Sequence, residues 1–187
     1  LPFYSVLLED FYSAYTAVSH LIETSCRNIS GIFGNPAMSI TQLRLKGYRK
    51  ALLDHGLRCL PEFECFSDDA RQAETCARKL LSAPTPPDGI FAMTDEVLIG
   101  ALPAIASSVG NIPGDCAVIC ISDGFLPYCL QPQVTFLLHD GFEVGRLAAE
   151  KLLGLIESGE YKAPGYSGEK LMLQARLVEL ATTRPLE

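Results

Sequence analysis

The sequence predicts an α/β protein built on a doubly wound parallel sheet, and two observations carry that prediction. Strand-like runs alternate with helix-like runs along the chain, and the connections are long enough to cross over between parallel strands. The run 116–121 is apolar throughout, as expected of a strand buried on both faces at the centre of such a sheet. With 187 residues, 48% of them hydrophobic, the chain can bury the core of one large domain or of two small ones.

The N-terminal third of the chain predicts two strand–helix units. The β-branched and aromatic run 3–8 suits a strand, and residues 12–25 place their aliphatic side chains on one helical stripe. The next strand is 28–33. A turn-forming segment follows it, and a helical pattern then covers about 40–55, with Gly56 placed to end the helix.

The middle of the chain predicts two further units. Residues 58–66 suit a strand, and the helix 67–81 opens with a serine and two aspartates, which favour a helix N-terminus. A short buried strand, 89–93, leads into the helix 96–109. Pro103 lies inside that helix and removes a backbone donor, so we expect a kink or a break there.

The C-terminal third continues the alternation. The apolar strand 116–121 and the strand 133–138 are separated by a proline-containing loop. A long helix, 142–158, then ends at Gly159. Residues 170–180 are strand-like and can divide into two short strands. We expect the strands between residues 28 and 138 to form one parallel sheet in the order second, first, third, fourth, fifth.

Polar side chains follow five of the predicted strands. Because the carboxyl ends of parallel strands meet at one edge of a sheet, these side chains should line one crevice, where open α/β sheets bind their ligands. Arg44 lies about one turn into a helix and can reach back over the crevice as a forked donor, while the aspartates accept bonds from ligand hydroxyls. The polar junctions are Glu9 and Asp10, Asn35 to Ser39, Thr94 and Asp95, Ser122 and Asp123, and His139 and Asp140.

Each of these residues also has a structural interpretation. Asp95 and Asp123 can be caps or turn formers, Arg44 a solvated cation, and His139 a structural histidine. A catalytic relay of Ser122, His139 and Asp95 is disfavoured, because Ser122 lies in no Gly-x-Ser-x-Gly elbow. The sequence has neither a Gly-x-Gly-x-x-Gly fingerprint nor a P-loop. We therefore assign no catalytic residue and no cofactor.

Composition narrows the classes of partner. The formal net charge is −7, with no basic stripe to grip nucleic acid and no apolar run of the roughly 18 residues that a membrane span needs. The opening residues lack the basic region of a signal peptide. The seven cysteines, an odd number without a Cys-x-x-Cys pair, indicate reduced thiols in a cytoplasmic protein. The histidines and cysteines show no metal-ligand spacing.

Several short segments match a known family, in order, along nearly the whole chain. They are Gly34 with Ser39, Arg44, Gly47 and Tyr48; 88–95 with Gly100 and Ala101; 110–115; 121–123; 132–135; 145–148; and 177–183. Together they resemble the ligand-binding module of the lactose and galactose repressor family, which shares its fold with type I periplasmic sugar-binding proteins. The closing segment is more similar to the repressors than to the periplasmic branch.

The resemblance implies a type I periplasmic-binding-protein-like fold with one lobe complete and the other partial. Residues 1–27 would belong to a partial N-terminal lobe, 28–138 to the C-terminal lobe, and 139–166 to a return to the N-terminal lobe. Residues 167–187 would form one or more closing strands of the C-terminal lobe and a tail. The rest of the N-terminal lobe, and an N-terminal helix-turn-helix domain that reads operator DNA, would lie in a missing upstream segment. The helices 12–25 and 142–158 should then expose apolar stripes or cover them with a neighbouring molecule.

By position, the resemblance implies a set of ligand contacts. Arg44 stands where the family places a ligand-binding arginine. Thr94, before Asp95, replaces a commoner asparagine, and Ser122 replaces the first of two acids. The candidate ligand-binding residues are Arg44, Asp95, Ser122, Asp123, His139, Ser39 and Glu9. His139 occupies a position often held by glutamine, and Glu9 replaces an aspartate, so the departures leave the identity of the ligand open.

The function implied is the effector-sensing domain of a bacterial DNA-binding transcriptional regulator that binds a small sugar-like metabolite. It would act in the cytoplasm as a homodimer, with the helix that begins at Glu96 and the loop 125–130 at the twofold interface. One alternative is a sugar-binding receptor component of transport or chemotaxis. Another is an enzyme that uses Ser122 or Asp95 in catalysis.

Overall fold

Among the residues that the structure describes, six strands form the main sheet, in the order β3-β2-β4-β5-β6-β8. The computed structural model describes residues 4–163 and 166–185. Every neighbouring pair in the main sheet is parallel except β6 and β8, which are antiparallel. The expected order of the five parallel strands is therefore confirmed. The strands are β2 Ile29–Phe33, β3 Glu64–Phe66, β4 Gly89–Ala92, β5 Ala117–Ser122, β6 Thr135–Leu138 and β8 Arg176–Val178.

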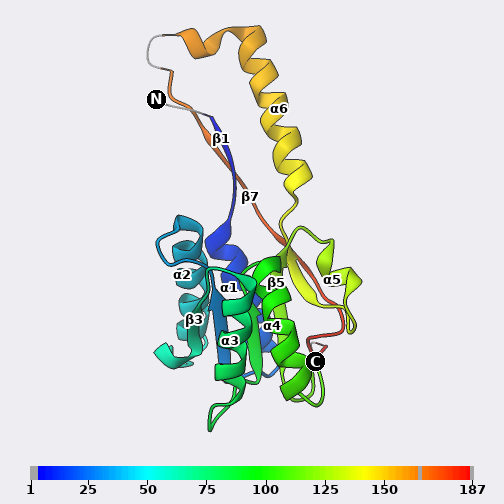
Figure 1. The fold of residues 1–187 in the computed structure, drawn as a ribbon. Helices are drawn as coiled ribbons and strands as arrows, with labels where there is room; N and C mark the ends of the chain where they lie inside the picture. The colour runs from blue at the N-terminus through cyan, green and yellow to red at the C-terminus, as the bar shows by residue number, and fades with distance from the viewer. Residues whose placement is uncertain (1–3, 164–165, 186–187) are drawn as a thin grey trace.

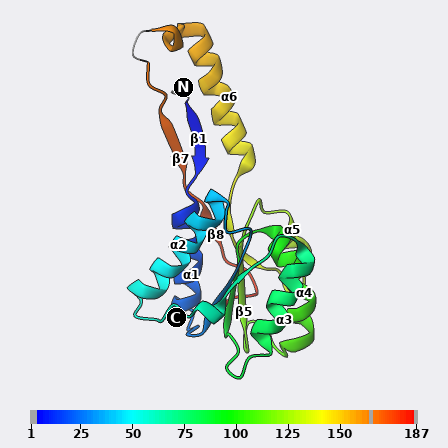
Figure 2. The ribbon, with the colours of Figure 1, turned by 60° about the vertical axis from the view of Figure 1, so that its left-hand side comes forward.

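Two pairs of helices cover the main sheet, one pair on each face (Figure 2). α1 (Asp10–Glu23) packs against α2 (Ser39–Asp54), and α3 (Ala70–Leu81) packs against α4 (Asp95–Ser108). A short helix, α5 (Leu126–Cys129), lies between β5 and β6 in the chain. Because both faces are covered, the central strands are fully buried, and they are mostly apolar. The doubly wound α/β fold is confirmed.

Glycines let each helix pair approach closely. A Cβ atom on Gly47 of α2 would lie 2.1 Å from the backbone oxygen of Phe11 in α1. A Cβ atom on Gly100 of α4 would lie 2.2 Å from the backbone oxygen of Ala70 in α3. No side chain fits at these distances. The close packing of α1 on α2 and of α3 on α4 therefore requires glycine at both positions.

A slender arm extends from this lobe (Figure 1). It consists of β1 (Ser5–Leu8), which pairs in parallel with β7 (Lys170–Leu173), the helix α6 (Gly141–Ser158) and a 3-10 turn, Glu160–Lys162. α6 contacts β1 but has no buried residue. The chain crosses between lobe and arm three times: from β1 to α1, from β6 to α6, and from β7 to β8.

The observed boundaries of the lobe correct our expectations from the sequence. The helix expected at 12–25 belongs to the lobe, because Ala14, Ala17, Val18 and Leu21 of α1 are fully buried in its core. The prediction of an exposed apolar stripe is therefore wrong for α1. The same prediction is confirmed for α6, where the exposed apolar residues are Phe142, Leu152, Leu153 and Ile156.

The two ends of the chain divide differently from the expected segments. The strand-like run 170–180 forms two strands, of which β7 lies in the arm and only β8 in the lobe. The expected assignment of 167–187 to the lobe is therefore wrong for β7. The expected strand 3–8 is observed from Ser5, and its residue 3 lies outside the described residues.

Three local predictions also change. Pro61 starts a 3-10 turn, so the strand expected at 58–66 covers only Glu64–Phe66. Asp69, not Ser67, caps α3, and the Ser67 hydroxyl donates to the carbonyl of Phe33 instead. α4 continues through Pro103 without a break.

Candidate functional site

A cavity of about 290 Å³ opens at the carboxyl ends of β4, β5 and β6. It lies beside the point where the chain leaves the lobe for α6, because His139 is one of its walls. Five predicted ligand contacts line it: Arg44, Asp95, Ser122, Asp123 and His139. They come from four separate segments of the chain, which the parallel sheet brings to one edge. The other lining residues are Thr94, Glu96 and Ile121.

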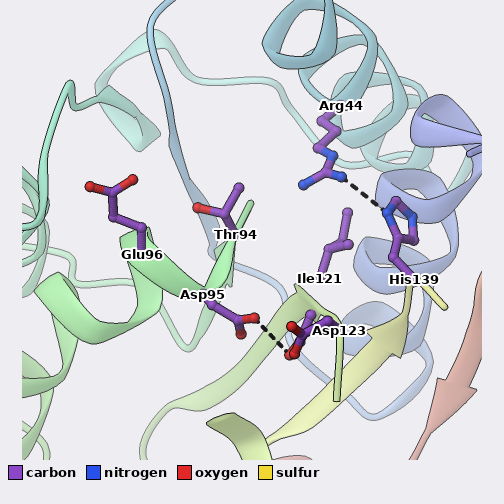
Figure 3. A pocket seen from close by; sticks show the side chains of 8 residues that line it. Arg44, Thr94, Asp95, Glu96, Ile121, Asp123 and His139 are labelled. Carbon is purple, nitrogen blue, oxygen red and sulfur yellow. Dashed lines mark hydrogen bonds between the residues drawn. The ribbon is translucent and has the colours of Figure 1, made fainter. Parts of the chain in front are cut away.

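The buried guanidinium of Arg44 lies at one side of the cavity, next to His139 (Figure 3). Its Nε donates to Asp10 Oδ1 at 2.8 Å, and its Nη2 lies 2.7 Å from the same oxygen. Nη1 donates to the carbonyl of Met93, and Nη2 is 3.2 Å from His139 Nδ1. An arginine has five N–H donors, so these contacts use all but one. We expected the paired N–H donors of the Arg44 guanidinium to face the ligand, but they are directed at Asp10.

His139 links Arg44 to the start of α1. Because arginine can only donate, His139 Nδ1 must accept, and the ring proton is on Nε2. Nε2 then donates to Ser13 Oγ at 2.8 Å, and Ser13 Oγ donates to the carbonyl of Glu9 at 2.6 Å. Burial and, to a lesser extent, the nearby charge of Arg44 lower the pKa of His139 to about 4, and the charge of Asp10 opposes them. The imidazole is therefore neutral near pH 7.

Asp95 and Asp123 form an acidic wall opposite Arg44. Ser122 Oγ donates to Asp95 Oδ2 at 2.9 Å, and Asp123 Oδ1 accepts from the backbone N–H of Phe125 at 3.0 Å. Asp95 Oδ1 is buried without a hydrogen-bond partner among the described residues. Burial is the largest effect on the pKa of Asp95 and raises it. The hydrogen bond from Ser122 and the backbone N–H of Asp123 lower the pKa, whereas the charge of Asp123 raises it. The exposed carboxylate of Asp123 can accept further hydrogen bonds at this wall.

Two of the predicted contacts lie elsewhere. Ser39 is exposed at the first residue of α2 and lines no described cavity. Glu9 contributes its backbone carbonyl to the Ser13 bond, and its side chain does not line the cavity. Asp10, which follows Glu9 at the same junction, is the residue that reaches Arg44. Helical spacing could have suggested Ser13, which lies one turn after Glu9, but nothing in the sequence linked it to His139.

A second cavity of about 260 Å³ adjoins the first and shares Thr94 and Glu96 with it. Thr94 caps α4, because its side chain accepts from the N–H of Val97. The remaining walls come from the ends of β2, β3 and β4 and the start of α2. They are Gly34, Asn35, Met38, Ile40, Thr41, Ser67, Asp68, Asp69, Met93 and Val97.

The geometry does not assemble the catalytic relay considered from the sequence. Ser122 bonds to Asp95, whereas His139 bonds to Arg44 and Ser13. Within residues 4–163 and 166–185, no group of three histidine, cysteine or acidic residues could hold a metal ion. No helix in that part of the chain is both long enough and apolar enough to cross a membrane.

Comparison with known sequences identifies relatives along nearly the whole chain. The profile of the periplasmic binding protein-like domain matches residues 18–182. The probable HTH-type transcriptional repressor ExuR of Bacillus subtilis is 30% identical over 161 residues, which are 85% of this chain and 48% of that protein. The HTH-type transcriptional repressor CytR of Escherichia coli is 28% identical over 183 residues, 97% of this chain and 52% of that protein. The chain thus spans about half the length of the curated relatives it matches.

Solved structures show the same fold. The transcriptional regulator CelR in complex with cellobiose has a TM-score of 0.84 and 26% identity, covering 97% of this chain and 54% of that one. A LacI family regulator from Enterococcus faecium with bound ribose has a TM-score of 0.81 and 21% identity, covering 98% of this chain and 66% of that one. The Enterococcus faecium regulator, at 21% identity, is similar to this chain in fold alone.

Proposed function

Since the chain belongs to the family of periplasmic binding protein-like domains, we propose that it is the effector-sensing part of a bacterial DNA-binding transcriptional regulator. In this proposal a small sugar-like metabolite binds in the cavity at the carboxyl edge of the main sheet. Of the two bacterial relatives described above, CytR is named an HTH-type transcriptional repressor and ExuR a probable one, and such repressors are not enzymes. The CelR relative, at 26% identity, is described in complex with cellobiose. Both findings support a regulator over a catalyst.

The observation that carries the proposal is the position of the Arg44 network. Arg44 bonds to Asp10, just after the β1-to-α1 crossover, and to His139, just before the β6-to-α6 crossover. A ligand in the cavity therefore touches the groups that fix two of the three connections between lobe and arm. A ligand that binds one arrangement of lobe and arm more tightly than another shifts their populations, and this is how an effector signals to a distant domain.

The partners follow from the same proposal. Operator DNA would be read by a helix-turn-helix domain in a part of the protein outside this chain, which itself carries a formal net charge of −7. A homodimer would form through α4 and the loop after β5, where Ile99, Phe125 and Tyr128 are half or more exposed. The regulator would act in the cytoplasm without a cofactor.

Calorimetry on the full-length protein tests the site. Sugars are titrated into wild type, Asp123→Asn and a matched control, Asp115→Asn, which changes an exposed aspartate outside both cavities. A hydrogen bond to a charged group contributes about 1.5–3 kcal/mol, so Asp123→Asn should weaken binding about ten- to a hundredfold. Asp115→Asn should leave it unchanged. Equal affinities in all three proteins would mean that the sugar does not bind in this cavity.

An operator-binding assay separates the regulator from the transport alternative. The sugar that binds should change the affinity of the full-length protein for its operator. If the sugar binds and operator affinity does not move, or if no operator is bound, the receptor interpretation replaces the regulator. The two experiments together therefore distinguish a wrong site from a wrong biological role.

A further inference from the structure

The walls of the two adjoining cavities are strongly acidic. Five carboxylates line them, and among the described residues Arg44 is the only lysine or arginine that does so. The five are Asp68, Asp69, Asp95, Glu96 and Asp123. Sugar hydroxyls alone require acceptors but not this excess of negative charge.

The single cation does not balance that excess. Arg44 lies 2.7 Å from the carboxylate of Asp10, which lines neither cavity, and its side chain is 5% exposed. Its charge is therefore committed to an internal ion pair. His139 contributes no positive charge either, because its Nδ1 accepts from Arg44 and the ring is neutral.

The carboxylates differ in how far the protein satisfies them. Asp69 caps α3, and Asp68 accepts from the side chain of Asn35 at 2.9 Å. Asp95 keeps one buried oxygen without a partner, and Asp123 lies beside it (Figure 3). Asp123 is exposed at this wall and accepts one backbone N–H, so a ligand gains most by supplying further donors and a positive charge there. A ligand carboxylate or phosphate would be repelled from the same place.

We propose that the ligand of this cavity is a polyhydroxylated amine, of the amino-sugar class, whose protonated amino group pairs with Asp95 and Asp123. The hydroxyl groups bond to the remaining polar walls, and sugars that carry a carboxylate or phosphate are excluded. The inference rests on the proposed function, because it names the chemistry of the same effector site. It is independent of the DNA-binding role.

Matched sugars of different charge test the proposal. Glucosamine, glucose and glucuronate share one ring and carry charges of about +1, 0 and −1 at neutral pH, and galactosamine, galactose and galacturonate form a second set. Each is titrated calorimetrically into the full-length protein at pH 7. In the set that fits the cavity, the amino sugar should bind at least about tenfold more tightly than the neutral sugar, and the uronate should not bind. Added salt should weaken the amino sugar more than the neutral one.

Charge-neutralising variants locate the preference. Asp95→Asn should reduce the ratio of amino-sugar to neutral-sugar affinity about tenfold, and the control Asp115→Asn should leave the ratio unchanged. Equal or tighter binding of a neutral sugar, or any binding of a uronate, overturns this inference and leaves the proposed function standing. If no sugar of either set binds, a hexose-sensing function fails, and the inference fails with it.

Discussion

The helices α1 and α6 make a direct comparison between the lobe and the arm. Each follows a short strand, and each carries an aliphatic stripe at helical spacing. The stripe of α1 is completely buried against α2 and the main sheet, whereas α6 has no buried residue. The same sequence pattern thus gives a core element in one region and an uncovered surface in the other. Periodicity predicts a helix and its apolar face, but not what covers that face.

The two helices are also stabilised differently. α6 has an aspartate N-cap, Asp140, a left-handed C-cap at Gly159, and ion pairs from Arg146 to two glutamates on its surface. α1 has no side-chain cap at Glu9. Local capping and charge pairs support the helix that lacks packing, and burial supports the helix that lacks a cap. Matched substitutions in the two regions can measure this division.

The largest effect is expected where the lobe meets the arm, at the buried Arg44–Asp10 pair. On the 187-residue chain, Arg44→Ala should lower the free energy of unfolding by about 3–5 kcal/mol, because it leaves Asp10, the Met93 carbonyl and His139 without their donor. The control Arg78→Ala removes a half-exposed pair with Glu74 and should cost less than about 1 kcal/mol. Urea unfolding of both variants measures the difference. Equal costs would mean that Arg44 is not structurally required and is free to contact a ligand.

The second pair of variants compares a leucine in each helix. Leu21→Ala in α1 creates a cavity in the core and should cost about 2–5 kcal/mol, because Leu21 is fully buried. Leu153→Ala in α6, where the side chain is 59% exposed, should change stability by less than about 0.5 kcal/mol. Thermal or urea unfolding of the 187-residue chain provides the measurement. A large cost at Leu153 would show that another molecule covers α6 in solution, and the contrast with α1 would disappear.

The sequence predicts the lobe better than it predicts the boundary with the arm. The strand order and the grouping of Arg44, Asp95, Ser122 and His139 follow from alternating elements and a parallel sheet, which are local rules. The placement of α1 depends on the Gly47 contact with the backbone of Phe11, and no local rule assigns that partner. Likewise, the sequence places several acidic residues at the same sheet edge as Arg44, and only tertiary packing selects Asp10 as its partner.

A third comparison uses one glycine inside a helix of each region. Gly100→Ala in α4 should cost about 1–3 kcal/mol or more, because the new Cβ would lie 2.2 Å from the backbone oxygen of Ala70. Gly154→Ala in α6 meets no atom within 4 Å and should stabilise its helix by up to about 1 kcal/mol, since alanine has the higher helix propensity. Circular dichroism during unfolding distinguishes the two signs. A stabilising Gly100→Ala would mean that α3 and α4 pack less tightly than described.

The smallest effect concerns His139, the last residue before the arm, and it depends on pH. The folded pKa is about 4, below the ordinary value of 6.5. Between these values the unfolded chain binds a proton that the folded chain does not, so stability rises with pH in this range and is lost as pH falls from 6.5 towards 4. Buried His20, whose pKa is also lowered, adds a slope of the same sign to the pH dependence of stability, so the comparison needs a variant of His139 alone.

His139→Gln keeps an acceptor for Arg44 and a donor for Ser13 without a titrating ring. Between pH 7 and pH 5.5, wild type should lose about 1 kcal/mol more stability than His139→Gln in urea unfolding. Parallel pH profiles for the two proteins would show that the ring of His139 is solvated in the folded state, and the bonds proposed to tie the lobe to the arm would not persist in solution.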